Sequence, residues 1–195
     1  MSTRLLFIIG AATKPGRLAT AVRTTANEAE DRYPDVVVGV VDLGVVRPAV
    51  CDGRPEDEYD DRTRAALSEV AAADAVVLAS PVYRASMTGT LKNFLDLVPV
   101  ASLQGKPVGI VGMGASQHHH LAIEAHLRDV LAWFGALVAP TAVYLTSDDF
   151  SEGTLTSVTA AQSLRDLTDT LLTLATRLAD VALGPSPLAA HVWKG

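Results

Sequence analysis

The 195 residues suffice for one domain with a sizeable core, and a composition of 49% hydrophobic and 19% charged residues is globular rather than disordered. The net charge of −6 argues against a protein that tracks nucleic-acid phosphates, because such proteins carry a basic face. A single cysteine, Cys51, excludes a disulfide framework and a thiolate metal cluster. The first residues lack a signal-peptide pattern, and no stretch approaches the roughly 20 apolar residues of a membrane span. We therefore expect a cytoplasmic protein without nucleic-acid or membrane partners.

Short apolar runs alternate along the chain with longer amphipathic segments. The apolar runs predict five strands, at residues 4–10, 35–43, 74–81, 106–114 and 137–145. The amphipathic segments predict helices at residues 16–33, 60–73, 89–98, 120–136 and about 159–183. Because the runs are almost continuously apolar, they are typical of a parallel sheet covered on both faces. The sequence therefore predicts an α/β sandwich with helices on both faces of a five-stranded parallel sheet.

The domain organisation follows from composition along the chain. There is no internal repeat and no Ser/Gly-rich linker, so residues 1–183 are expected to form one domain. Residues 44–60 form a long acidic connection after the second predicted strand. Residues 184–195 are rich in proline and are expected to form a tail on the surface or against a partner subunit.

Ligands of such sheets bind at the carboxyl ends of the strands, where the topology reverses. The first loop at that edge, residues 10–18 (GAATKPGRL), opens a helix, and the free N–H groups of a helix start can bind a phosphate. It is not a P-loop, because five residues separate Gly10 from Gly16, and it is not the G-x-G-x-x-G dinucleotide motif. An ordinary strand-to-helix turn remains the alternative.

The second and third loops at this edge have features of a site for a flat heteroaromatic ligand. In residues 80–89 (SPVYRASMTG), Pro81 ends the strand and an aromatic, Tyr83, follows, which suits a flat heteroaromatic ligand. The alternative is that Tyr83 packs the loop and Arg84 is solvated. Residues 112–120 (GMGASQHHH) are small before the histidines, and small residues allow close backbone approach to a ligand.

Three consecutive histidines, His118, His119 and His120, raise the question of a metal site. At a helix start their side chains point about 100° apart, so they cannot converge on one ion. On an extended segment His118 and His120 could share a face, but only Glu124 is near enough to complete a ligand set. We therefore expect no metal site.

Two long segments, ASPVYRASMTGTLKNFLDLVP (79–99) and LQGKPVGIVGMGASQHHHLAIEAHLRDVLAWFGA (103–136), resemble the flavodoxin-like NAD(P)H-dependent FMN reductases. The closest resemblance is to the reductase component of two-component alkanesulfonate monooxygenases, and it extends from Leu5 to about Ala136. It implies a flavodoxin-like three-layer sandwich with strand order 2-1-3-4-5. It further implies hydride transfer from NADPH or NADH to FMN, a homodimer or homotetramer, and a flavin-dependent monooxygenase as candidate recipient of the reduced flavin.

The resemblance also implies which residues bind FMN. The isoalloxazine contacts fall on Pro81, Val82, Tyr83, Arg84, Ala85 and Ser86. The third-loop contacts fall on Gly114, Ala115, Ser116 and His119. The phosphate contacts fall on Gly10, Ala11, Thr13, Gly16, Arg17 and Leu18. No catalytic residue is expected, because hydride transfer to a flavin requires no protein nucleophile or base.

The first loop departs from the pattern of the family, which places Ser and Arg residues there. This chain has Ala11, Thr13, Gly16 and Leu18 at those places, so several hydroxyl donors are missing. Each hydrogen bond lost to a charged group costs roughly 1.5–3 kcal/mol unless it is replaced. Thr13, Arg17, Lys14 and the backbone amides must then bind the phosphate, or FMN binds weakly.

Three other functions remain open at this point. The first is a flavoprotein that retains FMN and reduces quinones or azo compounds. The second is a flavodoxin-like electron-transfer module without NAD(P)H activity, against which the mild charge argues. The third is a non-enzymatic homologue with impaired flavin binding, which the substitutions in the first loop suggest.

Overall fold

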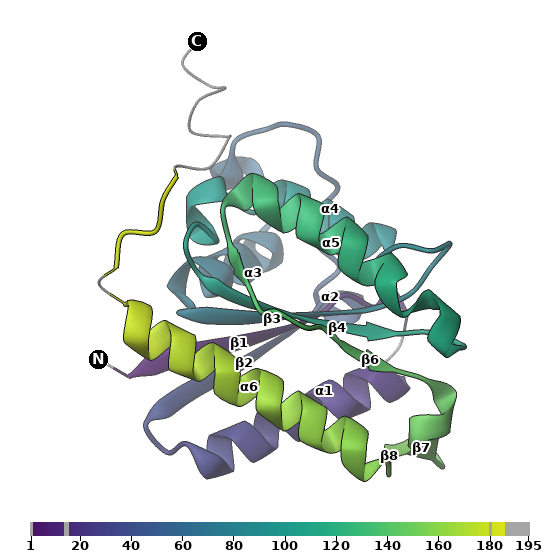
Figure 1. The fold of residues 1–195 in the computed structure, drawn as a ribbon. Helices are drawn as coiled ribbons and strands as arrows, with labels where there is room; N and C mark the ends of the chain where they lie inside the picture. Colours follow the sequence, from purple (N-terminus) through teal and green to yellow (C-terminus); the bar gives the residue numbers. More distant parts are fainter. Residues whose placement is uncertain (1, 14–15, 180, 186–195) are drawn as a thin grey trace.

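The computed structural model describes residues 2–13, 16–179 and 181–185, and its centre is a parallel sheet (Figure 1). Its strands are β1 (Thr3–Ile9), β2 (Val36–Asp42), β3 (Ala75–Pro81), β4 (Pro107–Met113), β5 (Leu137–Val138) and β6 (Val143–Leu145). The order is β2-β1-β3-β4-β5, with β6 also paired to β4, and all these pairs are parallel. The predicted order 2-1-3-4-5 is confirmed, and it is the flavodoxin-like order.

Helices cover both faces of this sheet, as predicted. Figure 1 shows α1 (Arg17–Arg32) and α6 (Val158–Leu178) on one face, and α3 (Asp61–Ala72), α4 (Gly89–Leu97) and α5 (His120–Phe134) on the other. Side chains of β1 alternate between the two cores: Leu5 and Phe7 pack with α1 and α6, whereas Leu6 and Ile8 pack with α3, α4 and α5. No helix in the described residues is both long and apolar enough to span a membrane.

The predicted fifth strand, 137–145, is interrupted, and the prediction of one continuous strand is wrong. Val138 is in register with Val108 of β4, and Val143 is in register with Val111. The segment therefore advances five residues where β4 advances three, and its two extra residues loop out of the sheet. Pro140 lies at the interruption and has no N–H to donate to a ladder. Arg128 Nη2 donates to the carbonyl oxygens of Ala139 (2.8 Å) and Pro140, which stabilises the interruption.

Short elements complete the described chain. The acidic connection contains α2 (Leu43–Val46) and the 3-10 helix Glu56–Glu58, and a hairpin of β7 (Phe150–Ser151) and β8 (Thr154–Leu155) follows β6. The other 3-10 helices are Val100–Ser102, Gln117–His119 and Ser147–Asp149. Helix α6 ends at Leu178, earlier than the predicted 183, because Val181 and Leu183 are exposed and a longer helix would bury little more. Residues 186–195 of the predicted tail lie outside the described residues.

Candidate flavin site

The three predicted loops begin side by side at the carboxyl edge of the sheet. The N–H of Gly10, after β1, donates to Ala79 O on β3 at 2.7 Å. The N–H of Val82, after β3, donates to Met113 O on β4 at 2.8 Å. Backbone pairing therefore brings the starts of the three loops to one edge of the sheet.

A buried hydroxyl network fixes the first loop to the second. The Thr88 hydroxyl donates to Gly10 O and accepts from Leu91 N at 3.1 Å, so it also caps the amino end of α4. The Thr88 N–H donates to Ser80 Oγ at 3.1 Å. Thr88 is 1% exposed and Ser80 is fully buried. These two residues were missed by the sequence analysis, although a Thr before a Gly that starts a helix is a visible capping signal.

Gly10 is required where the first loop leaves β1. A Cβ at this position would lie 2.8 Å from Leu91 Cβ and 3.0 Å from Ala79 O. The loop is also packed on its far side, because a Cβ on Gly44 of α2 would lie 2.6 Å from Thr13 O. The backbone of the first loop is thus held between α4 and α2.

The amino end of α1 leaves its first N–H groups without a side-chain cap. Gly16 is the N-cap and offers no hydroxyl or carboxylate, and the Leu18 side chain is buried among α1 and α6. Only the backbone of Leu18 can therefore contact a ligand here. Arg17 is exposed, and an uncapped helix start beside a cation suits a phosphate.

The second loop is a tight turn with unfavourable backbone angles. Tyr83 N donates to Ser86 O at 2.8 Å, and Ser86 N donates to Tyr83 O at 3.0 Å. Between them Arg84 and Ala85 have φ of 51° and 61°, as in a type I′ turn. Such angles cost on the order of 1–3 kcal/mol for each non-glycine residue and are often found at functional sites. The Tyr83 side chain is 48% exposed, so it is not buried in the packing of the loop.

The third loop is shaped by Tyr144 of β6. Its hydroxyl donates to Ser116 O at 3.1 Å, and a Cβ on Gly114 would overlap the Tyr144 oxygen. Only glycine therefore fits at position 114 beside this ring. Burial raises the pKa of the Tyr144 hydroxyl above its usual value of 10.0. Tyr144 was not predicted from the sequence, because no local pattern marks it as part of the site.

The histidines lie at the far end of the third loop. His119 Nδ1 lies 3.4 Å from Ser116 Oγ, and His120 Nδ1 lies 3.0 Å from Gln117 O. All three histidines are exposed. In the part of the chain that the structure describes, no group of three or more His, Cys, Asp or Glu residues could hold a metal ion.

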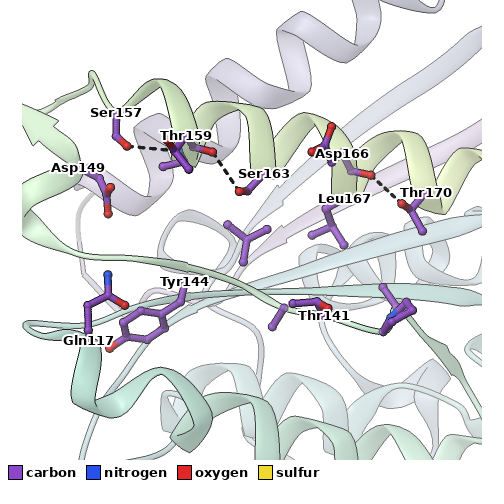
Figure 2. A pocket seen from close by; sticks show the side chains of 15 residues that line it. Gln117, Thr141, Tyr144, Asp149, Ser157, Thr159, Ser163, Asp166, Leu167 and Thr170 are labelled. Atoms are coloured by element: carbon purple, nitrogen blue, oxygen red, sulfur yellow. Dashed lines mark hydrogen bonds between the residues drawn. The ribbon is translucent and has the colours of Figure 1, made fainter.

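A cavity of about 500 Å³ lies next to the third loop rather than between the three loops. Figure 2 shows it between α6, which contributes Thr159, Ser163 and Thr170, and the β5–β6 segment with Thr141 and Tyr144. None of the sixteen predicted residues lines it. The cavity and the candidate flavin site are therefore neighbouring but separate features.

Comparison with known proteins identifies the family. Residues 3–150 match the family described as NADPH-dependent FMN reductase. An NAD(P)H-dependent FAD/FMN reductase of Geobacillus thermodenitrificans is 36% identical over 125 residues, which are 64% of this chain and 68% of that protein. The NADH-dependent FMN reductase SfnF of Pseudomonas putida is 27% identical over 86% of this chain and 90% of that protein.

A solved oxidoreductase from Corynebacterium diphtheriae has the same fold, with a TM-score of 0.74 at 24% identity over 91% of this chain and 99% of that chain. The fold is flavodoxin-like. The chain belongs to the NADPH-dependent FMN reductase family. The prediction of an enzyme that uses FMN and NAD(P)H is confirmed.

Proposed function

We propose that FMN binds along the carboxyl edge of the sheet, with its phosphate at the start of α1 and its ring system against the second and third loops. The observation that carries the proposal is the backbone pairing that holds Gly10, Val82 and Gly114 side by side. Gly10 and Gly114 keep this edge free of side chains where a Cβ would collide with neighbouring atoms. The residues present therefore fit a ligand with an anionic end and a flat end.

Each loop would have its own task in the reaction. The uncapped N–H groups of α1 and the Arg17 guanidinium would bind the phosphate. The Tyr83–Ser86 turn and the small third loop would orient the ring and leave one face open to the nicotinamide ring of NAD(P)H. Bound FMN supplies the hydride-accepting chemistry. The contribution of the protein is the alignment of two rings, so no residue is assigned as acid, base or nucleophile.

We further propose that FMN dissociates between turnovers and that its reduced form is delivered to a flavin-dependent monooxygenase. The support is the composition of the first loop, where Gly16 provides no side-chain cap and Ala11 no hydroxyl. The similarity to SfnF, an NADH-dependent FMN reductase, supports FMN as the acceptor of the hydride. A homodimer or homotetramer in the cytoplasm is also proposed. Exposed Leu121 and Trp133 on α5 would be covered in such an oligomer.

Steady-state oxidation of NADPH and NADH, with and without added FMN, tests this function. We expect the purified protein to be nearly colourless and its activity to depend on added FMN. A yellow protein that turns over quinones or azo compounds by a ping-pong mechanism, without turning over free FMN, would show retained FMN instead. A protein that oxidises neither donor in excess FMN would contradict the proposed function altogether. The oligomeric state is read separately by analytical ultracentrifugation.

A further inference from the structure

A fourth loop, residues 146–157, reaches the carboxyl edge from β6. Its start is fixed by a reciprocal capping box, in which Thr146 N donates to Asp149 Oδ2 at 2.8 Å and the Thr146 side chain accepts from Asp149 N. Its end is fixed as well, because Thr156 N and Ser157 N donate to Asp149 O at 2.9 and 3.1 Å. The hairpin that begins at Phe150 is therefore anchored at both ends.

This anchored hairpin places the Phe150 ring under Arg17, the first residue of α1. The Arg17 Cζ lies 5.9 Å from the centre of the ring, within the range of a cation–π contact. Arg23 and Arg32 on the same helix pair with Asp42 and Asp169. Within the described residues, Arg17 forms neither an ion pair nor a hydrogen bond with a carboxylate. Arg17, at the junction of the first loop and α1, is thus a cation that contacts the ring of Phe150.

Stacking is compatible with anion binding by the same side chain. A guanidinium stacks through its flat face, whereas its N–H donors lie in the plane and stay available to a phosphate. A free arginine side chain loses much rotamer freedom when it binds, and a residue that orders it beforehand lowers that cost. Asp149 directly precedes Phe150 in the sequence. Its carboxylate accepts hydrogen bonds from Thr146 and therefore does not compete for Arg17.

We infer that Phe150 is a positioning residue that orders Arg17 for the phosphate of FMN. The inference rests on the proposed placement of that phosphate at the first loop. It explains how a loop with few hydroxyls still binds an FMN that dissociates between turnovers: a preordered guanidinium provides part of the donors that Ala11 and Gly16 lack. Because Phe150 acts through Arg17, it affects FMN and leaves riboflavin, which has no phosphate, unaffected.

The test is fluorescence titration of FMN and of riboflavin with four single variants and one double variant. Phe150→Leu keeps an apolar side chain and removes the ring, and we expect the Kd for FMN to rise about three- to tenfold. The Kd for riboflavin stays unchanged, and Phe150→Tyr restores FMN binding. Arg17→Ala weakens FMN binding at least as much, and Phe150→Leu adds little to it in the double variant. Arg32→Ala is the matched control, because Arg32 stacks on Tyr33 at the other end of α1 and has no part in the site.

Three results would overturn the inference. One is an unchanged Kd for FMN in Phe150→Leu, the second is an equal loss for FMN and riboflavin, and the third is full additivity with Arg17→Ala. If Arg17→Ala leaves the preference for FMN over riboflavin unchanged, the proposed phosphate site itself is wrong. Should Phe150→Leu not fold, Phe150→Trp replaces it: the stronger cation–π partner is expected to keep or tighten FMN binding, and weaker binding contradicts the inference.

Discussion

The Thr88 hydroxyl donates a hydrogen bond to the carbonyl oxygen of Gly10, which joins the amino end of α4 to the carboxyl end of β1. The two residues are 78 positions apart in sequence, and the contact is buried. It holds the first loop in place beside the second. The geometry of the proposed flavin site therefore depends on one side chain that is not expected to touch the flavin.

Replacement of Thr88 tests this dependence. Thr88→Val keeps the shape but leaves Gly10 O and the first turn of α4 without a partner, so the free energy of unfolding should fall by about 1–3 kcal/mol. Thr88→Ser retains the hydroxyl, and its free energy of unfolding should fall by less than half as much. Urea denaturation measures both variants. Equal stability of Thr88→Val and the unchanged protein would show that the hydrogen bond from Thr88 to Gly10 O does not stabilise the fold.

Gly114 and Tyr144 offer a test by compensation. Gly114→Ala should destabilise the protein by about 1–3 kcal/mol and weaken FMN binding, because the added methyl overlaps the Tyr144 oxygen. Tyr144→Phe removes that oxygen and should restore part of both properties in the double variant. A double variant no better than Gly114→Ala would mean that the third loop is not shaped by this contact.

The turn at Arg84 and Ala85 should store strain. Ala85→Gly relieves a positive φ and should raise the free energy of unfolding by up to about 1 kcal/mol, despite the entropy cost of glycine. Ala65→Gly, at an exposed position of α3, is the control and should lower it by about 1 kcal/mol. Loss of stability in both variants would argue that the turn is unstrained. FMN titration of Ala85→Gly shows whether the strained angles also serve binding.

Tyr144 should make stability depend on pH in the alkaline range. Burial raises the pKa of its hydroxyl in the folded state above the usual value of 10.0. Below pH 10 both states hold the proton and the full stability is present. Between the unfolded and the folded pKa only the unfolded state ionises, so stability falls as pH rises. Tyr144→Phe should flatten this decline in urea denaturation between about pH 9 and 11. Parallel curves for the two proteins would contradict a raised pKa.

Much of the fold could be predicted because local patterns of apolar residues indicate its strands and long helices. The first four strands are continuous apolar runs, and their ends brought the three loops to one edge without knowledge of any contact. The fifth strand was predicted wrongly because a continuous apolar run does not show where a strand is interrupted. Pro140, which cannot donate a ladder hydrogen bond, did indicate an interruption. Helix α2 and the hairpin at Phe150 are too short for periodicity to reveal.

The supporting residues of the site could not be predicted, for a different reason. Thr88, Gly44 and Tyr144 act through contacts with residues far away in sequence, and such contacts leave no periodic signal. The resemblance to a family assigned the residues expected to contact FMN, yet it did not show that the Leu18 side chain faces the core. Tertiary packing determines both the roles of these supporting residues and the direction of the Leu18 side chain.

The most direct measurement of the central claim is a crystal structure of the protein with FMN. We expect the phosphate at the amino end of α1, near Arg17, and the ring against residues 81–86 and 114–116. FMN in the cavity between α6 and the β5–β6 segment, with the three loops empty, would contradict it.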